Sequence, residues 1–226
     1  EAAIIEMNNI RAARRDDGDD DESPPPPAPM TPEPMPEHQV PTGSDGSPTP
    51  KAQRNFTDAE SRIMKTGDGF VQGYNAQAVV DEAHQIIVAQ DVSNQSPDAE
   101  HFVPMIDRAI QNCGAVPEKL SADTGYFSAA NVQRASARSV DVYVATKRTK
   151  HGAPTDATDA VEDDHSPKAR MKAKLSTAQG AKIYSRRKVI VEPPFGQIKN
   201  RGFRGFLLRG LEKVRGEWAL MTLTHN

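Results

Sequence analysis

The chain has 226 residues, with 28 Lys or Arg, 31 Asp or Glu and one cysteine, a length that suits one domain with or without a tail. The charge is segregated: residues 1–50 hold 11 acids and three bases, whereas residues 168–215 hold 14 bases and two acids. One cysteine excludes an internal disulfide and fits a reducing cytoplasm, while the absence of an 18-residue apolar run excludes a membrane span. The basic half indicates a polyanionic partner such as nucleic acid.

The N-terminal part is acidic and rich in proline. Residues 1–15 are predicted to be the end of a helix, and an acidic run follows over residues 16–22. Eleven of the 18 prolines lie between Pro24 and Pro50, where they favour extended conformations and bury too little apolar surface to offset the ordering entropy. We therefore expect residues 1–54 to be a disordered linker or insertion, with a partner-docking arm as the alternative.

From residue 55 on, the pattern is typical of an α/β domain. The elements predicted from periodicity and capping signals are strands at 70–80 and 85–92, a helix at 96–113 opened by Ser96, a strand at 119–123, a helix at 128–138 capped by Ser128, and a strand at 141–145. Hairpin strands come first and crossover strands follow. This order predicts a mixed sheet flanked by helices.

A polar segment and two helices complete the chain. Residues 147–167 are acidic and polar, which predicts a mobile loop. A helix is expected over about 177–192 and is predicted to end at Pro193 and Pro194, because a proline inside a helix costs about 3 kcal/mol. A second helix would then start near Pro194, and the last helix is expected over about 211–223.

Two carboxylates are candidates for chemistry. Asp123 ends the predicted strand 119–123, where α/β folds expose functional groups; the alternative is an Asp that stabilises its own turn. Glu192 lies in the basic stretch and would share a helix face with Lys199 if the helix continued; the alternative is a surface ion pair. Two acids from different elements beside a basic groove suit divalent metal ions aligned with a phosphodiester.

Five segments form a specific combination: FTDAESRIMKTGDGFVQGYNAQAVVD, SADTGYFSAANV, DVYVATKR, YSRRKVIVEPPFGQIKNRGFRGFLLRGLEKVRGEWAL and the closing THN. Together, over residues 55–226, they resemble the DDE-type transposases of bacterial insertion sequences. The resemblance implies a ribonuclease-H-like catalytic domain over 55–226. In that family an Asp, Asp, Glu triad binds two Mg²⁺ ions, cuts transposon ends and joins them to target DNA. The second Asp would be Asp123 and the Glu would be Glu192.

The resemblance also implies cofactors, partners and a location. The metal would be Mg²⁺, with Mn²⁺ as a substitute, and the partners would be transposon ends and target DNA, without a membrane. A homodimer on paired ends and a bacterial, nucleoid-associated place in the cytoplasm are further implications. Lys199 fits the spacing of a basic residue that follows the family's Glu, and Tyr184 and Arg187 fit with an offset of one residue. The full set of expected DNA-binding residues is Tyr184, Arg187, Lys188, Lys199, Arg201 and Arg204.

The first Asp of the family lies in an Asp-Gly-Thr strand, and this chain contains no such tripeptide. The resemblance therefore implies that the first strand and its Asp lie upstream of Glu1. Asp45-Gly46-Ser47 looks similar but stands in proline-rich sequence, which excludes a central strand. Two alternatives stay open: a truncated remnant that binds DNA without chemistry, and a ribonuclease-H-like nuclease unrelated to transposition.

Overall fold

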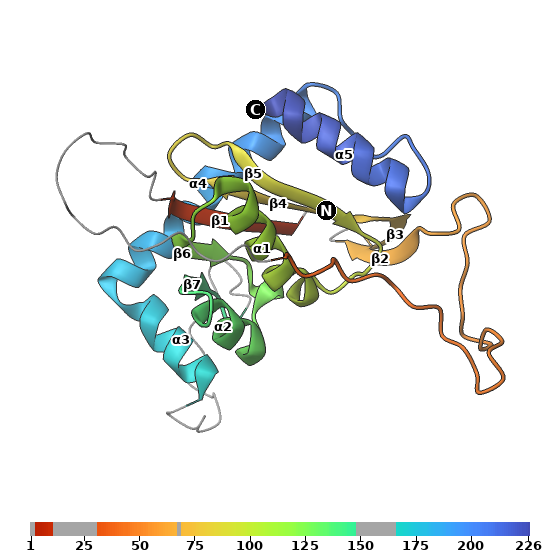
Figure 1. Cartoon of the computed structure of the whole chain (residues 1–226), viewed down its shortest axis with the longest axis horizontal. Helices are drawn as coiled ribbons and strands as arrows, with labels where there is room; N and C mark the ends of the chain where they lie inside the picture. Colours follow the sequence, from red (N-terminus) through yellow and green to blue (C-terminus); the bar gives the residue numbers. More distant parts are fainter. Residues whose placement is uncertain (1–2, 11–30, 67–68, 148–165) are drawn as a thin grey trace.

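A five-stranded sheet lies at the centre of the molecule (Figure 1), in a computed structural model that describes residues 3–10, 31–66, 69–147 and 166–226. The strand order is β5-β4-β1-β6-β7. β1 is parallel to β4 and antiparallel to β6, whereas β5 is antiparallel to β4 and β7 is parallel to β6. The bounds are Ala3–Ile10 for β1, Asn75–Asp81 for β4, Ile87–Ser93 for β5, Pro117–Ala122 for β6 and Asp141–Val144 for β7. With its helices, the chain is an α/β protein.

The elements expected between residues 85 and 145 are present. Helix α1 spans Phe102–Cys113 and ends at Gly114, whose φ of 63° gives it the left-handed conformation of a C-cap. Helix α2 spans Ala129–Ser136, and Ser128 caps it by accepting a hydrogen bond from the Asn131 N–H at 3.0 Å. The expected cap by Ser96 is wrong. A short 3₁₀ turn, η1 (Asp98–His101), precedes α1, and no side chain caps it.

The strand predicted over 70–80 is two strands in the structure. β3 (Gly69–Gly73) pairs with β2 (Arg62–Thr66) in a separate two-stranded sheet, and β4 begins only at Asn75. Tyr74 stands between them, and its hydroxyl donates to Asp58 at 2.7 Å. The sequence FVQGYNAQAVV carries no signal for a strand break apart from Gly73. The division into β3 and β4, and with it the β2–β3 hairpin, was therefore not expected.

Strand β1 is a second departure from expectation. Residues 1–15 were predicted to end a helix, and the first strand of the sheet was predicted to be missing. Instead, residues 3–10 form β1 between β4 and β6 and pair with both. This position supplies backbone partners to two strands that would otherwise carry unpaired groups at the buried centre of the sheet. The acidic run at 16–22 lies outside the described residues.

Residues 31–38, which we call the strap, lie against the body of the domain. Met35 is buried, and the His38 N–H donates to Asn94 Oδ1 at 2.8 Å. Ser93 Oγ donates to the Pro36 carbonyl oxygen. The expected disorder is therefore wrong for residues 31–38, whereas residues 11–30 lie outside the described part of the chain. The domain boundary at residue 55 stays a prediction.

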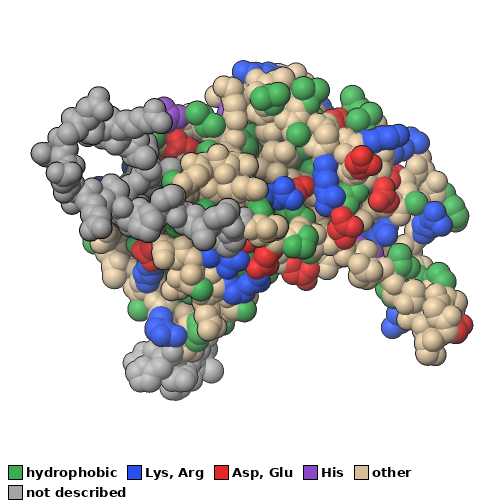
Figure 2. Space-filling model, viewed as in Figure 1, with side chains coloured by type: hydrophobic (Ala, Val, Ile, Leu, Met, Phe, Trp, Pro, Cys, Tyr) green, Lys and Arg blue, Asp and Glu red, His purple; other side chains and the backbone are tan. Residues whose placement is uncertain are grey.

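Ion pairs tie the strap to the helices. Glu33 pairs with Arg134 and, at 3.0 Å, with Arg138, while Glu37 pairs with Arg215 at 3.1 Å. The hydrogen bond from Arg134 holds the pKa of Glu33 below its usual value. Figure 2 shows basic and acidic side chains close together on this side of the molecule.

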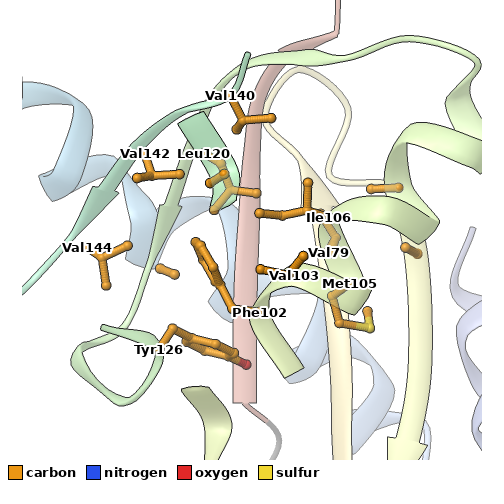
Figure 3. Close-up of a cluster of buried hydrophobic side chains, with 14 of the residues drawn as sticks. Val79, Phe102, Val103, Met105, Ile106, Leu120, Tyr126, Val140, Val142 and Val144 are labelled. Atoms are coloured by element: carbon orange, nitrogen blue, oxygen red, sulfur yellow. The ribbon is translucent and has the colours of Figure 1, made fainter. Parts of the chain in front are cut away.

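Two layers of helices cover the two faces of the sheet. On one face, α1 and α2 pack on the strands, and Figure 3 shows Phe102 and Ile106 of α1 among valines of the sheet. On the other face lie α4 (Ala178–Asn200) and α5 (Leu211–His225). The core between the sheet and this second layer includes Ala76, Ala78 and Val80 of β4, Ile190 and Val191 of α4, and Val214 and Trp218 of α5. β4 is buried along its whole length because both faces are covered.

A tight turn joins α3 (Pro167–Ser176) to α4. Thr177 caps α4 by accepting a hydrogen bond from the Gly180 N–H at 2.9 Å. A Cβ atom at Gly180 would lie 2.0 Å from the Lys174 carbonyl oxygen. Only glycine therefore fits at this position without movement of the turn. Of the loop predicted over 147–167, residues 148–165 lie outside the described residues.

Helix α4 continues through Pro193 and Pro194, so the predicted interruption is wrong. Pro193 has no N–H to donate to the Val189 carbonyl four residues earlier. The side chain of Gln85, at the turn between β4 and β5, donates to that carbonyl at 2.9 Å. A tertiary contact thus satisfies a group that a proline leaves without its helical partner.

The end of α5 is fixed to the same turn. Asn226 Oδ1 accepts from the Ile87 N–H and Asn226 Nδ2 donates to the Ile87 carbonyl, both at 2.9 Å. At the other end of α5, Asp58 accepts from the Gly210 N–H and Glu60 accepts from the Leu211 N–H. No helix in the described ranges is long and apolar enough to cross a membrane.

Candidate active site

Asp123 directly follows β6, at the end of a strand near the middle of the sheet. Ala122, the last residue of β6, pairs with β1 on one side and β7 on the other. Asp123 then begins the 3₁₀ turn η2 (Thr124–Tyr126), and the Tyr126 N–H donates to the Asp123 carbonyl at 3.0 Å. The Asp123 side chain is 49% exposed. A carboxylate on a rigid strand end, open to solvent, is thus available to a ligand.

Arg187 of α4 contacts this carboxylate. Its Nη1 atom lies 2.6 Å from Asp123 Oδ1, and the Arg187 side chain is only 12% exposed. The guanidinium carbon lies 5.2 Å from the centre of the Tyr184 ring, and Nε is buried without a hydrogen-bond partner among the described residues. Arg187, expected at DNA phosphates, therefore orients the Asp123 carboxylate in this structure. Because the Arg187 side chain is largely removed from water, loss of the Asp123 carboxylate would leave the arginine charge poorly solvated.

Glu192 lies on the outer side of α4. It is exposed and forms no ion pair or hydrogen bond with any described residue. Five residues separate it from Arg187, which corresponds to a rotation of about 140° around a helix of 3.6 residues per turn. The structure therefore brings Arg187, and not Glu192, into contact with Asp123. Since α4 is continuous, Glu192 and Lys199 do share one exposed face, as the seven-residue spacing predicts.

Asp123 and Glu192 carry the type of oxygen ligand that Mg²⁺ prefers, but the described structure does not bring them together. Among the described residues, no group of three or more His, Cys, Asp or Glu side chains is arranged to hold a metal ion. Mg²⁺ commonly uses one or two protein carboxylates and completes its shell with water and substrate phosphates. Asp123 offers one oxygen beyond the one that Arg187 contacts, and Glu192 has no partner within the described ranges. β1 contains no Asp, so the first Asp of the resemblance has no counterpart there.

The other expected DNA-binding residues lie on the surface around the end of α4. Lys188, Lys199, Arg201 and Arg204 are exposed. Lys199 and Arg204 border a cavity of about 750 Å³ between β3 and the loop that follows α4, with walls that include Tyr74, Phe203, Phe206 and Trp218. Arg201 also donates to the Thr224 carbonyl. Exposed bases of this kind suit phosphate contacts.

Sequence reasoning missed the groups that hold the Asp123 turn in place. Asp98 lies against Gly125: a Cβ atom at Gly125 would be 2.8 Å from Asp98 Oδ2. Two further polar residues, Asn75 and Gln77, are buried in β4. Their spacing of two along the strand places both on one face of the sheet. That pattern was the available signal for a buried polar cluster.

Comparison with known proteins identifies a family. A search of curated proteins finds no match, and a search of solved structures finds none either. The family model described as "Transposase DDE domain" matches residues 37–226, which is most of the chain and begins within the strap. The match includes β4 to β7, both layers of helices, Asp123 and Glu192. The chain belongs to the family of transposase DDE domains.

Proposed function

We propose that this chain contains a ribonuclease-H-like transposase domain that cleaves DNA at insertion-sequence ends and joins the ends to a target. The family match over residues 37–226 carries the proposal. Asp123 and Glu192 are the proposed metal ligands, with Mg²⁺ as the ion and Mn²⁺ as a substitute. A bound divalent ion would supply Lewis-acid stabilisation of a phosphodiester under attack.

The residues of the chain have separate tasks in this proposal. Asp123 presents a carboxylate at a fixed strand end, and Arg187 orients it. Lys188, Lys199 and Arg204 bind phosphates along the exposed side of α4 and the loop after it. The partners are transposon ends and target DNA, with two copies acting on paired ends in the bacterial nucleoid.

The test is a nicking assay on supercoiled DNA with Mg²⁺ or Mn²⁺. Asp123→Asn and Glu192→Gln each remove one proposed ligand and are expected to abolish nicking. Asp141→Asn is the matched control for Asp123, because Asp141 begins the neighbouring strand β7, is 51% exposed and also pairs with one base, Lys174. Glu212→Gln is the control for Glu192, because Glu212 is the second acid of the basic stretch. Wild-type nicking by Asp123→Asn would overturn the assignment.

A second candidate function is DNA binding without chemistry by a remnant. The observation that favours it is that the described residues contain no three-ligand group for a metal ion. Binding of this kind weakens steeply with salt and ignores Mg²⁺. A mobility-shift titration at two salt concentrations, with Mg²⁺ or with chelator, therefore separates the candidates. Metal-independent binding together with an absence of nicking would support the remnant.

A further inference from the structure

Three consecutive hydrogen bonds, which we call the hydrogen-bond chain, run along β4 beneath α1 and reach the turn that follows Asp123. The Tyr126 hydroxyl donates to Gln77 Oε1. Gln77 Nε2 donates to Asn75 Oδ1 at 2.8 Å, and Asn75 Nδ2 donates to Asp98 Oδ1 at 2.9 Å. The chain thus joins η1, which carries Asp98, to η2, which carries Tyr126, through two residues of β4.

The hydrogen bonds have one direction, which is set by three acceptors around the Asn75 NH₂ group: the Asp98 carboxylate at 2.9 Å and the carbonyl oxygens of Ser96 and Gln95 at 3.2 and 3.4 Å. A carboxylate only accepts hydrogen bonds, so Asn75 must turn its NH₂ group toward Asp98. The Asn75 oxygen then faces Gln77, which must donate its own NH₂ group and leave its oxygen for Tyr126. The Tyr126 hydroxyl is therefore required to donate. Burial, and then the negative charges of Asp98 and Asp123, raise the pKa of Tyr126, which keeps this donor protonated.

Burial makes every link costly to break. Tyr126 and Gln77 are fully buried and Asn75 is 5% exposed, whereas Asp98 reaches the surface. A buried polar group that loses its partner keeps the full penalty of its desolvation. The ring of Tyr126 is also fixed, because it packs against Phe102 with 5.9 Å between centroids (Figure 3). A change at Asp98 would therefore be felt at Tyr126 instead of being absorbed by water.

Asp98 also touches the turn directly. Its Oδ2 atom occupies the space that a side chain at Gly125 would need. Tyr126 in turn donates its N–H to the Asp123 carbonyl, and the Phe127 N–H donates to Thr124 at 3.1 Å. Asp98 thus contacts the middle of the turn and, through the chain, its last residue.

We propose that Asp98 is a positioning residue for Asp123, which acts through Asn75, Gln77 and Tyr126 to hold the Asp123 turn in one conformation. The proposal rests on the proposed function only where it treats Asp123 as a metal ligand. The coupling of Asp98 to the turn stands on the geometry alone. The two claims therefore have different readouts.

The first readout is amide hydrogen exchange in the full chain, followed by NMR. Asp98→Asn keeps the size of the side chain but replaces the charged acceptor nearest to the Asn75 NH₂ group by a neutral amide. We expect the Tyr126 and Phe127 amides to exchange about tenfold faster, while amides of α5 keep their wild-type rates, because the opening is local. Glu100→Gln removes a charge from the same 3₁₀ turn, where Glu100 accepts a hydrogen bond from the Gln95 side chain at the surface, and is expected to leave the Asp123 turn unchanged.

A double-mutant cycle tests the route. Tyr126→Phe removes the donor at the far end of the hydrogen-bond chain. In the double variant, the Phe127 amide is expected to exchange no faster than in the faster-exchanging single variant, because both changes break the same chain. Wild-type exchange at Tyr126 and Phe127 in Asp98→Asn would overturn the proposal. So would equal acceleration throughout the domain, because that result indicates general destabilisation.

The second readout is Mn²⁺-induced broadening of the Ala122 and Asp123 amides. In the wild-type chain we expect broadening, and in Asp98→Asn we expect several-fold more Mn²⁺ for the same effect. An absence of broadening in the wild-type chain would count against the proposed function. It would leave the exchange result, and with it the coupling, to be decided separately.

Discussion

The two faces of the central sheet are built in different ways. On the face under α1 and α2, each helix lies in sequence between strands that it covers, within residues 75–144. On the face under α4 and α5, the contacts span far greater separations: the Trp218 indole N–H donates to the Gln77 carbonyl, 141 residues away. The first face is formed by elements that are close in sequence, whereas the second forms only when the C-terminal helices pack against strands that are far from them in sequence.

This difference matters because the candidate site uses both faces. Asp123 directly follows strand β6 of the sheet, and in our proposal the hydrogen bonds from Asp98 hold its turn from the α1 side. Arg187 and Glu192 arrive with α4 on the other side. A change that loosens only the second face should therefore leave the Asp123 turn in place but remove its arginine.

The largest expected effect comes from Trp218→Ala, which removes the central side chain of the second face. Trp218 is 1% exposed and packs against Phe195 and Phe203, so we expect a loss of about 3–5 kcal/mol in the free energy of unfolding. Urea unfolding measures the loss, and Leu223→Ala, at a 70% exposed position of the same helix, is the control. If exchange protection falls equally in α1, the two faces form one cooperative unit and the comparison fails.

Gly180→Ala tests the turn that starts α4. The new methyl group would meet the Lys174 carbonyl at 2.0 Å, and overpacking of this kind costs about 1–3 kcal/mol. Gly196→Ala in the same helix meets no atom within 4 Å and should stabilise by about 0.5–1 kcal/mol, because alanine favours helix. Thermal unfolding of both variants gives the comparison, and the same sign for both would contradict the packing argument.

A smaller effect is expected at Gln85. Gln85→Ala removes the donor to Val189 and should cost about 1 kcal/mol, the usual net contribution of one hydrogen bond. In a Pro193→Ala background the helix regains its own donor to Val189, so the cost of Gln85→Ala should disappear. The cycle is measured by urea unfolding. An unchanged cost in the Pro193→Ala background would mean that Gln85 acts by another route.

The smallest effect at neutral pH concerns His101, which is fully buried with both ring nitrogens unpartnered among the described residues. Burial lowers the pKa of His101, against an opposing effect of the Asp98 charge. The unfolded chain then binds a proton at a higher pH than the folded chain, so stability is complete above about pH 6.5 and falls as pH drops toward the folded pKa. His101→Leu should flatten this part of the stability profile between pH 7.5 and 5. An identical slope in both proteins would exclude His101 as its source.

The part of the fold that sequence could predict is the part with local signals. The strands and helices between residues 85 and 145 follow from alternation, from the Ser128 cap and from Gly114. The prediction that Asp123 lies at the end of a strand is confirmed for the same reason, since β6 ends at Ala122.

The remaining features depend on partners distant in sequence. The pairing of β1 with β4 and β6 has no local signature. The continuity of α4 depends on Gln85, more than a hundred residues before Pro193, so the rule that proline ends a helix led to a wrong prediction. The Asp123–Arg187 contact was equally invisible, since Arg187 stands among bases that all suited DNA. The assignment of Glu192 as a metal ligand together with Asp123 stays a prediction.

The strap has a consequence for a nicked chain. Residues 42–48 form an exposed loop closed by a bridge between Thr42 and Pro48, and exposed loop tips are preferred sites of proteolysis. A single cut there would break the covalent link between residues 31–38 and the part of the chain that follows the loop. Because Met35 is buried and Glu33 and Glu37 are paired with arginines, the two fragments should still migrate as one particle on a sizing column. They should come apart only in denaturant.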